Sequence, residues 1–146
     1  MKLISHRGNI EGKEPANENH PYYIQKAINH GFDVEIDVRY DNGWWLGHEN
    51  PQYQIDLDYL SNPHFWIHCK NLKALVYLQN TKYNYFWHNV DSYTLTSHGW
   101  IWAYPNNPII AGSHSIAVLP EIHNTETNLF TGICSDVINN YVKEKR

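Results

Sequence analysis

The 146-residue sequence is poor in cysteine, has no long apolar run and does not concentrate its basic residues. Both cysteines, Cys69 and Cys134, fall in apolar runs that predict strands, so we expect buried free thiols, with a disulfide as the alternative. No run approaches the roughly 18 apolar residues of a membrane-spanning helix. The stretch Met1–Ile4 is too short for a signal-peptide core. We therefore expect a cytoplasmic protein without a membrane span.

The charge balance excludes one class of partner. The 11 Lys and Arg residues form no stripe, and the net charge is −4 with neutral histidines, so we expect no nucleic-acid partner. Aromatic residues are abundant, with six Trp, eleven Tyr and four Phe, which predicts a largely aromatic core with some rings left to line a pocket. The length predicts a single domain, 1–146. Nothing in the composition indicates an oligomeric state.

One stretch, residues 32–38, alternates aliphatic residues with carboxylates, which predicts a strand with an acidic face. The two faces are Val34, Ile36 and Val38 on one side and Asp33, Glu35 and Asp37 on the other. Carboxylates two positions apart repel each other unless a cation or a substrate proton lies between them. The alternative is a half-exposed edge strand whose acidic face is solvated.

The acidic strand follows a predicted strand over residues 3–5 and a predicted helix over 18–29. The order strand, helix, strand predicts a βαβ unit with parallel strands. Functional side chains in such units collect at the carboxyl ends of the strands. We therefore expect His6 and Arg7, at the end of the first strand, to face the same crevice as the carboxylates of the acidic strand.

Seven or eight strands and three or four helices are predicted along the whole chain, with no repeat or linker between them. The strands are drawn from nine candidate stretches, which are the two above together with 44–46, 65–70, 84–88, 93–96, 100–104, 115–119 and 131–134; further helices are expected over 71–80 and 136–143. A full (β/α)₈ barrel typically needs about 250 residues. The predicted fold class is α/β, a compact, pared-down TIM-type (β/α) barrel with several helices missing or shortened; an open α/β sheet is the alternative.

Four short motifs occur in order, mostly at predicted strand ends. They are Ile4-Ser-His-Arg-Gly8, Glu18-Asn19, Gly31-Phe-Asp-Val-Glu-Ile-Asp-Val38 and Gly47-His48-Glu49. Together they resemble the glycerophosphodiester phosphodiesterase family of the phosphatidylinositol-phospholipase-C-like phosphodiesterases, which use a TIM-type barrel. The match covers about the first third of the chain. Later segments, 94–97 and 100–105, are similar to those of short bacterial members, and Gly132–Asp136 resembles the family's closing strand and turn.

The resemblance implies an enzyme, a phosphoric diester hydrolase, and a role for each matching polar side chain. His6 and His48 would be the general acid and base, because imidazole titrates near working pH. Arg7 and Lys70 would hold the nonbridging phosphate oxygens. By the same resemblance, a hydroxyl of the substrate's own glycerol would attack phosphorus, giving a cyclic phosphate that water then opens.

The implied metal site departs from the family at one position. Glu35 and Asp37 would bind a divalent cation, Mg²⁺ or Ca²⁺, which polarises a phosphoryl oxygen. The family's third carboxylate is replaced here by His68, and imidazole suits transition metals better than Mg²⁺ or Ca²⁺. Mn²⁺ or Zn²⁺ is therefore the alternative cation, and Glu121, from a later strand end, is the alternative third ligand.

The function predicted in this way is that of a metal-dependent phosphodiesterase acting on a glycerophosphodiester or a related small phosphodiester. One alternative is a non-catalytic phosphodiester-binding module, because the chain is short and the third carboxylate is missing. Another is a lyase that stops at the cyclic phosphate. The aromatic residues Trp44, Trp45, Trp100, Trp102 and Tyr104 would either pack the core or form a wall for the substrate's alcohol. The remaining histidines, His88 among them, are expected to be structural or superficial.

Overall fold

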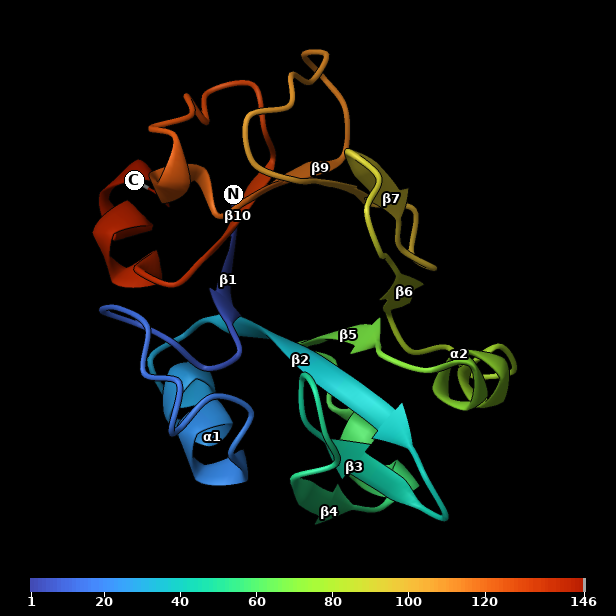
Figure 1. The fold of residues 1–146 in the computed structure, drawn as a ribbon. Helices are drawn as coiled ribbons and strands as arrows, with labels where there is room; N and C mark the ends of the chain where they lie inside the picture. Colours follow the sequence, from blue (N-terminus) through green and yellow to red (C-terminus); the bar gives the residue numbers. More distant parts are fainter. Residues whose placement is uncertain (146) are drawn as a thin grey trace.

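A computed structural model describes residues 1–145 and contains one ten-stranded mixed sheet with two short α-helices (Figure 1). The strands are β1 (Lys2–His6), β2 (Asp33–Tyr40), β3 (Trp44–Leu46), β4 (Tyr53–Ile55), β5 (Phe65–Cys69), β6 (Tyr85–Trp87), β7 (Tyr93–Leu95), β8 (Ile101–Ala103), β9 (Ser115–Val118) and β10 (Gly132–Ser135). The α-helices are α1 (Pro21–Asn29) and α2 (Leu72–Leu78), and the 3₁₀-helices are η1 (Leu57–Ser61), η2 (Pro120–Ile122) and η3 (Ile138–Lys145).

The middle of the sheet is parallel, as the βαβ pattern predicts. β1 lies between β2 and β10 and pairs in parallel with both. Parallel pairing continues from β10 through β9 to β8 on one side, and from β2 through β5 to β6 on the other. The β3–β4 hairpin extends antiparallel from the second half of β2, and β7 pairs antiparallel with β8. The carboxyl ends of β1, β2, β5 and β10 therefore meet at one edge.

The predicted TIM-type barrel is wrong, because the sheet curls strongly but is not closed (Figure 1). At the gap, the Ser97 backbone N–H donates to the Tyr85 carbonyl at 2.8 Å, but β6 and β7 form no strand pair in the part of the chain that is described. Only residues 96–100 connect β7 to β8. That connection is too short for the crossover that parallel strands need, so β7 turns back antiparallel instead of continuing the parallel series.

The chain also contains less helix than predicted. The predicted helices over 18–29 and 71–80 correspond to the shorter α1 and α2, whereas the predicted helix over 136–143 is the 3₁₀-helix η3. The segments between β8 and β9 and between β9 and β10 form no α-helix. Each contains an asparagine in the left-handed region, Asn106 with φ 65° and Asn124 with φ 49°, and such residues interrupt a right-handed helix.

β2 is a central strand, which excludes the half-exposed edge strand as the reading of the acidic stretch. Its aliphatic face packs against the two α-helices in one cluster that includes Val34, Ile36, Val38, Ile24, Ala27, Ala74 and Leu78. The other face looks into the curl of the sheet, where a second cluster comprises Ile4, Trp66, Phe86, Trp102, Ile116, Val118 and Cys134. Alternation therefore turns the carboxylates of Glu35 and Asp37 toward this inner side, where both are buried.

Both cysteines are free and buried, as expected. Burial raises the pKa of the Cys69 thiol to about 12 and holds that of Cys134 well above its usual range. Among the residues that the structure covers, there is no helix whose length and apolar character would let it cross a bilayer.

Candidate functional site

The residues predicted for the site gather at the carboxyl edge of the parallel strands. Six of the seven line one cavity of about 450 Å³, and they are His6, Arg7, Glu35, His48, His68 and Lys70. The seventh, Asp37, is fully buried and contacts three of these side chains. Residues far apart in the sequence are thus brought together as the strand-end rule predicts.

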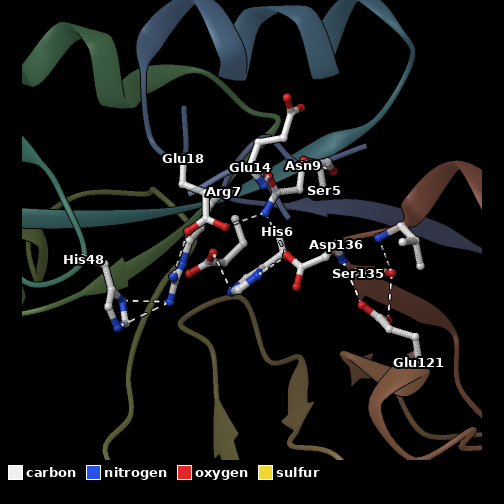
Figure 2. Close-up of polar contacts among 12 residues, drawn as sticks. Ser5, His6, Arg7, Asn9, Glu14, Glu18, His48, Glu121, Ser135 and Asp136 are labelled. Carbon is white, nitrogen blue, oxygen red and sulfur yellow. Dashed lines mark hydrogen bonds and ion pairs between the residues drawn. The ribbon is translucent and has the colours of Figure 1, made fainter. Parts of the chain in front are cut away.

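His6 ends β1 and is held on both sides of its ring (Figure 2). Its Nδ1 lies 2.7 Å from Asp136 Oδ1, and its Nε2 lies 3.8 Å from Glu35 Oε1. Asn9 Nδ2 donates to the same Asp136 oxygen at 2.8 Å. Burial lowers the pKa of His6, but the hydrogen bond to Asp136 and the charge of Glu35 outweigh it, and the pKa is raised overall. His6 therefore keeps its proton to a higher pH than an ordinary histidine.

Arg7 follows β1 in the left-handed region, with φ 59°, an uncommon conformation for a residue other than glycine. This turn directs its guanidinium across the site, where Nε lies 3.0 Å from Asp37 Oδ2 and Nη1 lies 3.2 Å from Glu18 Oε1. Its Nη2 lies 2.8 Å from His48 Nδ1 (Figure 2). Because a guanidinium can only donate, His48 Nδ1 serves as the acceptor in this contact, through its lone pair.

Asp37 is an anion whose charge is already well supported. Its Oδ2 accepts from Asn19 Nδ2 at 2.9 Å, and its backbone N–H donates to Asn19 Oδ1 at 3.0 Å. Burial raises the pKa of Asp37, but the charge of Arg7 and the hydrogen bond from Asn19 oppose burial, and the pKa lies well below its usual range. The Asn19 side chain thus fixes one oxygen of the carboxylate and leaves Oδ1 free.

Glu35, Asp37 and His68 form a buried group that could hold a metal ion. One ligand atom from each lies within 4.8 Å of the others, and His68 Nδ1 is 3.5 Å from both Glu35 Oε2 and Asp37 Oδ1. Glu35 Oε1 and Asp37 Oδ1 are buried and accept no hydrogen bond from the described residues. Since buried carboxylate oxygens are costly without a partner, this donor set fits a divalent cation.

Glu121, the alternative third ligand, lies elsewhere. Its carboxylate accepts hydrogen bonds from Ser135 Oγ at 2.8 Å and from the Asp136 backbone N–H at 3.1 Å (Figure 2). Glu121 therefore fixes the end of β10 and the position of Asp136. Of the two predicted third ligands, only His68 reaches the carboxylates of Glu35 and Asp37.

The two remaining predicted residues are positioned by their backbones. His48 follows Gly47, whose φ is +154°, and a Cβ there would lie 1.9 Å from the Asn50 carbonyl oxygen, so the tight turn requires glycine. Arg39 Nη1 donates to the His48 carbonyl at 2.9 Å. Lys70 directly follows β5, and its backbone N–H donates to the Val38 carbonyl at 2.9 Å. Its side chain lines the cavity and forms no ion pair with any described residue.

Sequence reasoning missed several contributors. Asp136 contacts His6, but the sequence pattern assigned it only to a closing turn. Its position directly after β10 is the same strand-end signal that identified His6. His88, expected to be structural or superficial, lines the cavity and stacks on Tyr104 with ring centroids 3.6 Å apart. The rest of the wall comprises Asn89, Trp102, Val118 and Leu119. Trp102 and Tyr104 were among the aromatic residues expected to pack the core or form a wall, whereas Asn89, Val118 and Leu119 were marked by no local pattern.

Comparison of the chain with protein-family models, with curated proteins and with solved structures finds no match.

Proposed function

We propose that the chain is a metal-dependent phosphodiesterase that cleaves a glycerophosphodiester or a related small phosphodiester. The observation that supports this most strongly is the shared cavity, which two cationic side chains, two histidines and a buried carboxylate–imidazole group all reach. Phosphoryl transfer needs charge stabilisation at the nonbridging oxygens, together with a base for the attacking hydroxyl and an acid for the leaving oxygen. Each requirement has a candidate side chain in the cavity.

Arg7 and Lys70 are the phosphate-binding groups in this proposal. The Arg7 guanidinium is oriented in advance by Asp37 and Glu18, so little side-chain entropy is lost when a phosphate binds. Lys70 adds a second positive charge from the end of β5. A phosphate oxygen that accepts from Arg7 Nη2 would compete with His48 for that donor and release the lone pair on His48 Nδ1.

The two histidines have complementary environments. His48 Nδ1 faces Arg7 as an acceptor, and once freed its lone pair would take the proton of the attacking hydroxyl. His6 is held by Asp136 at Nδ1 and has a raised pKa, so its Nε2–H would protonate the leaving oxygen. A divalent cation held by Glu35, Asp37 and His68 would, when bound, supply Lewis-acid polarisation of a phosphoryl oxygen.

A non-catalytic phosphodiester-binding module is the second candidate. Arg7 already contacts Asp37, and His6 faces Glu35, so cationic side chains balance both carboxylates without a metal ion. Such a site could bind a phosphodiester and leave it intact.

Phosphorus NMR of a panel of glycerophosphodiesters, incubated with the purified chain and Mg²⁺, Ca²⁺, Mn²⁺ or Zn²⁺, tests the proposal. We expect a phosphomonoester product, loss of activity with EDTA, and a fall in kcat of about 10²–10⁴-fold for His6→Ala and for His48→Ala. His98→Ala, which removes an exposed histidine, is the matched control and should keep full activity. A cyclic phosphate that persists would identify a lyase instead. Binding without turnover would favour the binding module, and the absence of both would overturn the proposal.

A further inference from the structure

The His68 imidazole is held by its surroundings in one orientation. Its Nε2 lies 3.3 Å from the His88 backbone carbonyl oxygen, and because a carbonyl can only accept, the ring hydrogen is on Nε2. Phe86 stacks against the ring with centroids 4.8 Å apart and planes 20° apart. In the neutral ring this leaves the lone pair of Nδ1 on the side of Glu35 and Asp37. A backbone carbonyl that accepts from the far nitrogen is the usual support of a metal-ligating histidine.

The carboxylates opposite this nitrogen are incompletely satisfied. His68 Nδ1 is 3.5 Å from Glu35 Oε2 and from Asp37 Oδ1, at the outer limit of a hydrogen bond. The side chains of Glu35 and Asp37 are 3% and 0% exposed, and Glu35 Oε1 and Asp37 Oδ1 accept no hydrogen bond from the described residues. Arg7 and Asn19 engage only the other oxygen of Asp37. The unsatisfied Oδ1 of Asp37 thus lies 3.5 Å from His68 Nδ1, and Glu35 presents Oε2 at the same distance while its Oε1 is left without a hydrogen bond.

The chemistry of this donor set discriminates between cations. Mg²⁺ and Ca²⁺ are bound by oxygen ligands, whereas an imidazole nitrogen favours zinc and its first-row neighbours. Three protein ligands with one open side are also characteristic of catalytic rather than structural zinc sites. The cavity lies on the open side, because Glu35 and His68 both line it.

We propose that Glu35, Asp37 and His68 form a site selective for Zn²⁺ over Mg²⁺ and Ca²⁺, and that His68 Nδ1 is the ligand that sets this selectivity. The proposal deepens the proposed function, since it names the cation of that site. It can be tested separately because cation binding needs no substrate. His88 then acts as a positioning residue through its backbone carbonyl, which fixes the tautomer of His68.

Calorimetric titration of the metal-free full chain with ZnCl₂, CoCl₂, MgCl₂ and CaCl₂ measures the selectivity. We expect Zn²⁺ and Co²⁺ to bind at least about tenfold more tightly than Mg²⁺ or Ca²⁺. Nitrogen-15 NMR of the histidine rings locates the ligand in the unmodified protein. Zn²⁺ should shift the Nδ1 resonance of His68 and leave its Nε2 protonated.

Two substitutions at one position then separate ligand chemistry from folding. His68→Gln should weaken Zn²⁺ binding by at least the ten- to hundredfold that loss of a supporting partner typically costs. His68→Glu creates an all-carboxylate set and should reverse the preference toward Mg²⁺ or Ca²⁺. His98→Gln, the same change at an exposed histidine, should leave Zn²⁺ affinity unchanged. Thermal unfolding of each metal-free variant confirms that the chain is folded.

Mg²⁺ or Ca²⁺ binding as tightly as Zn²⁺ would overturn the proposal. So would a His68 Nδ1 resonance that Zn²⁺ leaves unshifted, because the ion would then lie elsewhere. Tight, His68-dependent Zn²⁺ binding without phosphodiester turnover supports the metal site and overturns the phosphodiesterase. Phosphodiester turnover that depends on a cation whose binding His68→Gln does not weaken would support the phosphodiesterase and overturn the proposed role of His68.

Discussion

His6 and Asp136 are 130 positions apart in the sequence, yet His6 Nδ1 and Asp136 Oδ1 lie 2.7 Å apart. The contact follows from the parallel pairing of β1 with β10, in which Ser5 is opposite Ser135 and the next residue of each strand enters the site. Asp136 is itself fixed, because its backbone N–H donates to Glu121 and its carboxylate accepts from Asn9. The carboxylate therefore orients the His6 ring and supports its positive charge.

Asp136→Asn should lower the pKa of His6 in the metal-free protein, because the variant removes the negative charge that favours imidazolium. NMR titration of the His6 ring measures this directly. The asparagine retains the size and a hydrogen-bonding group, so the fold should persist. Asp58→Asn, at an exposed position in η1, is the control and should leave the His6 pKa unchanged. An unaltered His6 titration in Asp136→Asn would contradict the role given to this carboxylate.

The same pair predicts how stability depends on pH. The folded-state pKa of His6 is raised from 6.5, so its contribution is fully present below pH 6.5 and is lost as pH rises through the folded pKa. The pKa of Asp136 is lowered from 3.8, because its hydrogen bond with His6 outweighs burial; this contribution is present above pH 3.8 and lost as pH falls through the folded pKa. The stability difference between wild type and Asp136→Asn should therefore be largest between these two pH values, as measured by urea unfolding.

Asn19→Asp should destabilise the protein by about 1–3 kcal/mol, because it replaces the amide donor to Asp37 with a second buried carboxylate. Asn19 is in the left-handed region with φ 66°, which aspartate also tolerates, so the effect is electrostatic rather than conformational. Asn42→Asp provides a matched control at an exposed turn position with φ 50°. Urea unfolding should show a loss at position 19 and almost none at 42; equal losses would count against this interpretation.

Gly47→Ala should disturb the turn that carries His48. A Cβ at position 47 would lie 1.9 Å from the Asn50 carbonyl oxygen, whereas one at Gly43 would meet only the end of the Gln54 side chain at 3.7 Å. Both glycines have positive φ, 154° and 141°, so Gly43→Ala controls for backbone strain of about 1–3 kcal/mol. Thermal unfolding should show the greater loss for Gly47→Ala, and the chemical shifts of His48 should move only in that variant.

Lys70→Ala should weaken binding of a small phosphodiester by roughly tenfold, or about 1.4 kcal/mol, without a change in thermal stability. The expected reason is the loss of a positive charge that lines the cavity and forms no ion pair with a described residue. Lys73→Ala, three positions later on the exposed side of α2, is the control. Calorimetry with glycerophosphocholine as the probe measures both variants, and equal affinities would remove Lys70 from the binding site.

What the sequence could predict was local. The alternation of residues 32–38 identified both faces of β2. The strand-end rule predicted that His6 lies near the carboxylates of Glu35 and Asp37, 29 and 31 positions later. What it could not predict depended on distant or backbone interactions. The antiparallel direction of β7 follows from its short connection to β8, and the His88 backbone carbonyl can accept from His68 whatever side chain residue 88 carries. No side-chain pattern reports such contacts.

The position of β1 between β2 and β10 also determines when the site can form during synthesis of the chain. β1 emerges from the ribosome early, but the strand that pairs with its other edge is translated about 130 residues later. Until then the nascent chain has one unpaired edge of β1, lacks the Asp136 carboxylate that orients His6, and has an incomplete inner apolar cluster without Cys134. Completion of the site is therefore coupled to the last long-range pairing of the fold, a topology that favours slow folding and exposes an aggregation-prone edge to chaperones.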